Sequence, residues 1–198
     1  MHTLHQGVAC CAIAGLVLAK ILLHDPACTL QNLDRHLLAA YRHYRAWCRA
    51  NSISGSCVRF NRLRFGKEQW KSFPELSTQY KASTVKYMQY WVHAYLMDNR
   101  VAGDDDLVFA SYALAMFQHE LDVHGGWMDQ SERHKTAHYG FTFLLFYQKL
   151  AGNNRGEKRN FKMVPKFHYF YHMCEYIDRT GRNPRCRGIY FNVWNFYV

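Results

Sequence analysis

Residues 8–23 read VACCAIAGLVLAKILL and contain a single charged side chain, Lys20. A helix that is apolar on every face belongs in a protein core or in a membrane. The stretch is shorter than the roughly twenty apolar residues that a membrane span needs. No basic residue precedes it, as one would in a secretory signal. It therefore predicts a helix buried in the core, with a signal peptide or anchor at residues 8–23 as the alternative.

Five further segments show helical signals. Apolar side chains recur at steps of three and four in residues 29–50, and Thr29 is the expected N-cap. Pro74 suits a first helical turn and opens a predicted helix to about residue 98. The other predicted helices cover 106–124, 129–152 and 165–180, and Gly152 and Gly181 end the last two. Residues 51–66 remain open between a short helix and an irregular segment.

These segments predict an all-α fold, with one compact domain of five or six helices over residues 1–198 and an irregular C-terminal tail. A chain of this length buries a core without disulfides. It has no internal repeat, no long heptad run and no convincing domain boundary. The sequence IYFNVWNFYV near the end has the composition of a strand, but the chain offers no obvious partner strand.

The chain is basic, and its charge is uneven. Its 25 Lys and Arg face 15 Asp and Glu, which gives a formal net charge of +10. Residues 34–71 have a balance of +7 and residues 155–187 a balance of +6, whereas residues 98–135 have −5. Such charge favours polyanionic partners, above all nucleic acid. The alternative is that the two basic segments form separate solvated faces.

The candidate nucleic-acid contacts are basic residues of these two segments. They are Arg42, Arg45, Arg49, Arg59, Arg62, Arg64, Lys158, Arg159 and Lys162. Their cations would neutralise phosphates, and arginine can donate two hydrogen bonds to one phosphate at once. The tyrosines and phenylalanines between the arginines could stack on bases.

His168 and His172 are the candidate metal ligands, because a spacing of four places both on one helix face, as in the zinc motif HExxH. Tyr169 stands where that motif has its glutamate, so the general base is missing, and Glu175 is the candidate third ligand. We expect no cofactor, with zinc at this pair as the alternative. Weaker candidates are His134 with His138, the nearby Glu120, Asp122 and His124, and, for Mg²⁺, Asp104 to Asp106, which a helix N-terminus explains more simply.

Motifs of common enzyme classes are missing from the sequence. It has no dinucleotide fingerprint, no phosphate loop and no nucleophile elbow. The seven cysteines form no CxxC pair, so we expect reduced thiols in an intracellular protein of the nucleus or cytoplasm. The sequence favours a non-catalytic protein without excluding an enzyme.

The run MVPKFHYFYHM at residues 163–173, followed by NPRC at 183–186, carries a resemblance. It resembles uncharacterised protein families of dinoflagellate algae that have a Pro-Lys-x-His-x-x-x-His helix followed by Asn-Pro-Arg. The resemblance covers about residues 65–187 and assigns no role to Pro165, Lys166, His168 or His172. The helix is also similar to one late in eukaryotic transposases of the acidic-triad type, which implies a mobile-element origin.

The end of the chain departs from that pattern. The resemblance implies an acidic cluster after Asn-Pro-Arg, whereas this chain reads GIYFNVWNFYV and stops. Nuclease or transposase chemistry is therefore not expected. The ending is typical of a truncated reading frame, which leaves open that the chain is a fragment of a longer protein.

The leading prediction is a non-catalytic helical domain, related to mobile elements, that binds nucleic acid through phosphate contacts. The second is a helical protein–protein interaction module whose aromatic faces dock another protein or the missing remainder of the chain. The third is a metal-bound protein or hydrolase remnant built on His168 and His172. A membrane partner is not expected.

Overall fold

The computed structural model describes residues 4–54, 57–153 and 158–185, and it confirms the all-α fold. The described residues form six α-helices and no sheet, with one isolated bridge between Trp127 and Arg182. The elements are a π-helical turn η1 (Leu4–Val8), α1 (Ala9–His24), α2 (Leu30–Ala50), α3 (Ala82–Asp98), α4 (Asp105–Val123), α5 (Gln130–Gly152) and α6 (Pro165–Thr180). The predicted tail from residue 186 onward lies outside the described residues.

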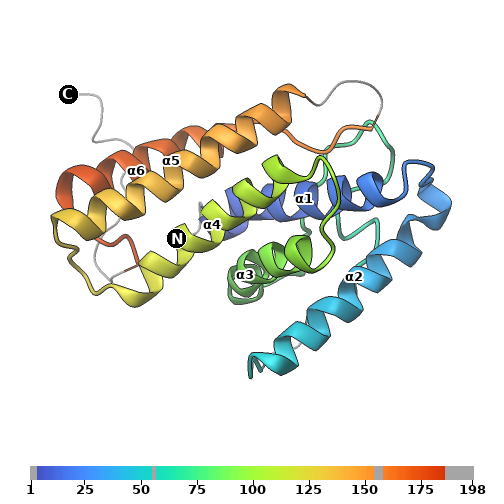
Figure 1. The fold of residues 1–198 in the computed structure, drawn as a ribbon, viewed down its shortest axis with the longest axis horizontal. Coiled ribbons are helices and arrows are strands. Elements are labelled where there is room, and N and C mark those ends of the chain that lie inside the picture. The colour runs from blue at the N-terminus through green and yellow to red at the C-terminus, as the bar shows by residue number, and fades with distance from the viewer. Residues whose placement is uncertain (1–3, 55–56, 154–157, 186–198) are drawn as a thin grey trace.

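Helix α1 forms the centre of the core, as its apolar sequence predicts. Every residue from Ala9 to Ile21 is buried, and the helix packs against α3 and α4 (Figure 1). The backbone of residue 160 approaches α1 so closely at Gly15 that a Cβ there would meet the Asn160 carbonyl oxygen at 2.5 Å. In the described part of the chain, no helix is long and apolar enough to cross a membrane.

The single charge of α1 is matched by a buried opposite charge. Lys20 Nζ lies 2.6 Å from Asp104 Oδ2, and both side chains are fully buried. Asp104 immediately precedes α4, and its carboxylate also accepts a hydrogen bond from the backbone N–H of Val101. A buried charge is tolerated only when it is paired and hydrogen-bonded. The contact therefore ties the C-terminal half of α1 to the start of α4.

Helices α4, α5 and α6 lie side by side with alternating directions, in a layer beside α1 and α3 (Figure 1). Aromatic rings fill the space between them: the Phe117 ring meets Phe170 at 5.0 Å, and Phe143 meets Phe170 at 5.7 Å. Helix α6 begins with Pro165 and ends at Gly181, whose φ of 68° is the left-handed conformation expected of a glycine C-cap. The predicted helices at 106–124, 129–152 and 165–180 are thus confirmed.

The prediction that a helix begins at Pro74 is wrong, because α3 begins only at Ala82. The backbone N–H groups of Glu75, Leu76 and Ser77 donate instead to carbonyls of residues 65, 10 and 64, at 2.8–3.2 Å. These distant acceptors satisfy the backbone N–H groups of residues 75–77 in an irregular conformation, so the segment does not need helical hydrogen bonds. The described residues between 51 and 66 are also irregular, which settles the alternative that the sequence left open.

Lys67 holds this irregular segment together from inside. Its ammonium is fully buried and donates to the carbonyl oxygens of Trp70 (2.9 Å), Ser72 (2.6 Å) and Arg159. Burial lowers the pKa of Lys67 to about 8. The three carbonyl acceptors join the 67–72 loop to the chain that leads into α6.

Candidate nucleic-acid interface

Helix α2 is amphipathic, and its outer face carries arginines. Leu33, Leu37, Ala40, Tyr44 and Cys48 are buried on the inner face. The outer residues Arg42, Arg45 and Arg49 are exposed. Their spacing of three and four places them on one side, about one helical turn of 5 Å apart. Figure 1 shows α2 extending away from the α4–α6 layer.

Contacts with α3 hold α2 in place. Trp91 Nε1–H donates to His43 Nδ1 at 3.1 Å, and His43 Nε2 lies 3.1 Å from Asp98 Oδ2. Because indole nitrogen can only donate, Nδ1 is the acceptor and Nε2 carries the proton given to Asp98. Because His43 is hydrogen-bonded to α3, these contacts fix the rotation of α2 about its axis. They therefore also fix the direction of the adjacent residue Arg42.

Residues 57–65, the return segment, lie along α2 and bring a second set of arginines to it. Tyr41 Oη donates to the Cys57 carbonyl at 3.0 Å, and the Phe60 ring lies between those of Tyr41 and Tyr44 at 5.3 and 5.7 Å. Near the start of α2, the backbone N–H of Arg62 donates to Asp34 Oδ1 at 2.7 Å. The return segment is therefore anchored to α2 by backbone and ring contacts, and the Arg64 guanidinium donates to Gln79 Oε1 at 2.8 Å.

Charges from α2 and from the return segment converge near Cys57. Burial raises the pKa of the Cys57 thiol to about 12, against the opposing effect of the positive charges of Arg45 and Arg64. Arg45 Nη1 donates to Tyr41 Oη at 3.1 Å, and Arg64 Nη1 donates to the Arg59 carbonyl at 2.7 Å. Arg45 on α2 and Arg64 on the return segment thus both lower the pKa of the Cys57 thiol.

Six of the predicted basic residues lie on α2 or on the return segment that contacts it: Arg42, Arg45, Arg49, Arg59, Arg62 and Arg64, hereafter the arginine surface. Within the described ranges, none of the six forms an ion pair with a carboxylate. The acidic residues nearest to them in sequence are Glu68 and Asp34, and Asp34 Oδ1 accepts a hydrogen bond from the backbone N–H of Arg62. Arg45 and Arg64 donate hydrogen bonds to neutral groups of Tyr41, Gln79 and Arg59, which leave the positive charges of the two side chains unneutralised.

The other three predicted contacts are engaged with the protein. Lys158 Nζ donates to the carbonyls of Pro26 (2.8 Å) and Cys28 (3.3 Å), beside the start of α2. The Arg159 guanidinium lies over the Phe73 ring at 5.7 Å, and Lys162 Nζ pairs with Glu75 Oε2 at 2.6 Å. Lys158 therefore meets the start of α2, whereas Lys162 is neutralised by a carboxylate.

The predicted metal ligands His168 and His172 do lie together on α6. Their Nε2 atoms are 3.1 Å apart, and His172 Nδ1 is 2.9 Å from Glu175 Oε2. Glu175 thus contacts the far side of the His172 ring and is not a third ligand beside the two Nε2 atoms. It is placed as the outer-shell carboxylate that often orients a metal-binding histidine. The pair supplies two ligands, where a structural zinc ion needs four.

The weaker metal candidates are separated by their partners. Asp104, Asp105 and Asp106 contact three different cations, which are Lys20, Arg100 and Lys149. His134 pairs with Asp178, whereas His138 lies 3.5 Å from the Thr142 hydroxyl. In the part of the chain that the structure describes, these residues form no group of three metal-ligand atoms.

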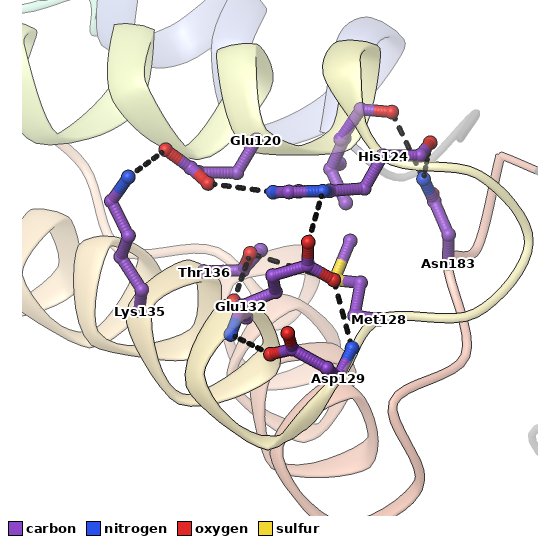
Figure 2. Close-up of polar contacts among 9 residues, drawn as sticks. Glu120, His124, Met128, Asp129, Glu132, Lys135, Thr136 and Asn183 are labelled. Carbon is purple, nitrogen blue, oxygen red and sulfur yellow. Dashed lines mark hydrogen bonds and ion pairs between the residues drawn. The ribbon is translucent and has the colours of Figure 1, made fainter.

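The acidic segment of the sequence forms a charged corner between α4 and α5 (Figure 2). His124 lies between two carboxylates: its Nε2 is 3.0 Å from Glu120 Oε2, and its Nδ1 is 3.2 Å from Glu132 Oε1. Lys135 Nζ approaches the other Glu120 oxygen at 2.9 Å. Asn183 donates to the His124 carbonyl at 3.0 Å, which joins the chain after α6 to the corner. The polar partners named here all belong to the protein, so we interpret this corner as a contact that stabilises the junction between α4 and α5.

The corner keeps Glu120 ionised although it is buried. Burial raises the pKa of the Glu120 carboxyl, but the hydrogen bonds and charges of Lys135 and His124 lower it more, so that the net pKa lies below the ordinary value. Glu132 and Asp129 also cap α5, because each side chain accepts from the other's backbone N–H at 2.8 Å.

One cluster was missed in the sequence. Asp25, Cys28 and His36 place their ligand atoms within 4.8 Å of one another at the turn between α1 and α2. Their spacing matches no common motif, and only the turn at 25–28 brings them together.

Comparisons of the chain with protein-family models, with curated proteins and with solved structures found no match.

Proposed function

We propose that this helical domain binds nucleic acid non-catalytically through phosphate contacts of the arginine surface. The observation that carries the proposal is the gathering of six arginines on α2 and the return segment, without carboxylate partners among the described residues. A cation that is already paired with a protein carboxylate gains little from a phosphate. Among the described residues these six arginines have no carboxylate partner, so a polyanion would interact with their positive charges without displacing one.

Arginine suits this role because of its geometry. Its planar fork donates two parallel hydrogen bonds to phosphate oxygens, which a lysine ammonium cannot do. The row of Arg42, Arg45 and Arg49 on a straight helix suits an extended backbone of phosphates better than a single small anion. Tyr41, which lies under the Arg45 guanidinium at 5.9 Å, adds an aromatic face beside the row.

The test is fluorescence anisotropy of a labelled 20-mer, duplex and single-stranded, titrated with protein at several salt concentrations. For duplex DNA the slope of log affinity against log salt is about −0.9 for each neutralised phosphate. The triple variant R42A/R45A/R49A removes three cations, so its slope is expected to be shallower by about 2.7 on duplex and about 2 on single strands.

A charge-matched control separates local contacts from net charge. The variant K149A/R179A/R182A also removes three positive charges, but from exposed side chains on α5, on α6 and just after it. It should bind with nearly the parent slope. Equal slopes for the parent and R42A/R45A/R49A would refute the proposal, as would equal losses in both triple variants.

A second candidate function, a protein–protein interaction module, rests on aromatic residues that α4 and α5 leave exposed. Phe109 is 51% exposed and stacks on Phe146 at 5.1 Å, and Tyr112 meets Tyr139 at 6.1 Å. Leu145, 66% exposed, lies on the same helix as Phe146. Exposed apolar clusters of this kind are typical of docking sites. Association in sizing experiments that is insensitive to salt and lost in F109S would favour this function.

The kinship with mobile elements and the dinoflagellate families stays a prediction, and so does a nuclear or cytoplasmic location. The resemblance to these families is supported by residues 163–173 and by the Asn-Pro-Arg of residues 183–185, and the run from Pro165 to His172 forms the first half of α6.

A further inference from the structure

We propose that Asp25, Cys28 and His36 form a binding site for a divalent transition-metal ion of the Zn²⁺ class. The three side chains present one oxygen, one sulfur and one nitrogen atom, all within 4.8 Å of one another. Cys28 is 1% exposed, whereas the Asp25 and His36 side chains are 31% and 25% exposed. An ion could therefore enter from solvent and meet a buried sulfur.

Backbone hydrogen bonds position two of the three ligands in the absence of an ion. The Cys28 N–H donates to the Asp25 carbonyl at 3.0 Å, which closes a four-residue turn with Pro26 at its second position. Proline presets the backbone for that position. Lys158 clamps the turn from outside by donating to the Pro26 and Cys28 carbonyls at 2.8 and 3.3 Å. Both turn ligands are therefore held in place by backbone contacts.

The third ligand is fixed by α2. The Thr29 N–H donates to Asn32 Oδ1 at 2.9 Å, so the first turn of the helix is capped immediately after Cys28. His36 lies in the second turn of the helix, and its ring reaches back to the turn that precedes α2. Asp25 and Cys28 thus lie in the hydrogen-bonded turn, and His36 lies in the helix that follows it.

The distance between two of the ligands fits a tetrahedral ion. His36 Nε2 lies 3.1 Å from Asp25 Oδ2. Bonds of 2.0–2.1 Å to a tetrahedral zinc ion would place such a nitrogen and oxygen about 3.3 Å apart. His36 Nε2 is buried and yet makes no well-aligned hydrogen bond. A nitrogen and an oxygen held this close are positioned to share a cation.

The charges also fit. A carboxylate and a thiolate together neutralise a divalent ion, with a neutral imidazole as third ligand. Cys28 Sγ now donates to Asn32 Oδ1 at 3.2 Å. When the ion binds, the S–H bond breaks, the proton leaves to solvent and the sulfur electron pair forms the metal bond. Three protein ligands leave one coordination position for water.

This site differs from the His168–His172 pair, which has no thiol and lies on α6. It also has a structural consequence, because the ion would link the turn before α2 to the helix that carries the arginine surface. The proposal rests on the cluster alone and does not depend on nucleic-acid binding.

The test is a titration of the full chain with Co²⁺, kept reduced by a non-thiol reductant, followed by displacement with Zn²⁺. A cobalt–thiolate bond gives a charge-transfer band in the near ultraviolet, which reports sulfur ligation directly. We expect about one ion per chain, by analogy with other single-ion sites, and loss of the band in C28S. H36Q should keep the fold, because His36 is partly exposed, and should weaken binding by more than the roughly tenfold to hundredfold that an outer-shell partner is worth.

Two controls assign the site. C57S removes a cysteine beside the same helix, and H168Q/H172Q removes the other histidine pair; both should leave the band and the affinity unchanged. The absence of a charge-transfer band in the parent protein would overturn the proposal. So would a band that survives in C28S, or one that is lost in C57S or H168Q/H172Q.

Discussion

Separating the buried pair of Lys20 and Asp104 should cost a large part of the free energy of unfolding. The perturbations are Lys20→Met, Asp104→Asn and the double variant. The two charged atoms are 2.6 Å apart, and both side chains are fully buried. Their attraction is about 6 kcal/mol at an effective dielectric constant of about 20. Desolvation of the two ions offsets much of this, so the pair contributes little net stability.

The single variants lose the attraction and keep one desolvated charge. In Lys20→Met the Asp104 carboxylate keeps only the Val101 N–H at 3.0 Å and the Arg100 guanidinium at 3.6 Å. In Asp104→Asn the Lys20 ammonium keeps a neutral amide oxygen. We expect each single variant to lose about 3–5 kcal/mol. The midpoint of thermal unfolding should fall by about 6–20 °C for a chain of this size.

The assay is urea unfolding followed by circular dichroism, arranged as a double-mutant cycle. The double variant buries no ion and should lose less than either single variant, which gives a coupling energy of several kcal/mol. A coupling below about 1 kcal/mol, typical of an exposed pair, would refute the reasoning that a buried charge needs its partner.

The pair also sets a pH dependence. Burial raises the pKa of Asp104, but hydrogen bonds from Lys20 and Val101 and the nearby positive charges lower it more, so that the net pKa lies below the ordinary 3.8. A carboxyl whose pKa is lower in the folded state stabilises the fold above its ordinary pKa. That stability is lost as the pH falls through the folded pKa. The difference between the parent and Lys20→Met should therefore shrink below about pH 4.

Three further predictions concern other contacts. Gly15→Ala would place a Cβ 2.5 Å from the Asn160 carbonyl oxygen and should destabilise the fold by about 1–3 kcal/mol in urea unfolding; an unchanged midpoint would contradict the close approach. Lys67→Met leaves three carbonyls without their shared donor and should cost about 1–3 kcal/mol or more, with faster proteolysis of the 67–81 segment as a second readout. His124→Gln removes a partner that lowers the pKa of Glu120, so the variant should be less stable at neutral pH, and the difference should vanish as the pH falls below the ordinary glutamate pKa of 4.5. A pH-independent difference would count against this assignment.

Most of the fold could be predicted because local signals and burial agree. The apolar run of α1 requires a core position, and Pro165 and Gly181 mark the ends of α6 as the sequence indicates. Pro74 carried the same signal as Pro165 but begins no helix. Its neighbours find hydrogen-bond acceptors at residues 10, 64 and 65, and such distant partners cannot be read from local sequence.

The candidate site was predictable in part for the same reason. The helical spacing of Arg42, Arg45 and Arg49 placed them on one exposed face, and the structure agrees. The inward roles of Lys158 and Lys162 depend on carbonyls and a carboxylate far away in the chain. The buried partner of Lys20 could also have been expected, because a single charge in an otherwise apolar, buried helix must be paired with an opposite charge.

The most direct test of the central claim is the salt dependence of binding to a labelled 20-mer. The parent chain should bind duplex and single strands with an affinity that falls steeply with salt, and R42A/R45A/R49A should flatten that slope by about 2–3 while K149A/R179A/R182A leaves it nearly unchanged. A folded parent protein that does not bind at low salt would contradict the claim, and the aromatic cluster of α4 and α5 would then mark the functional surface.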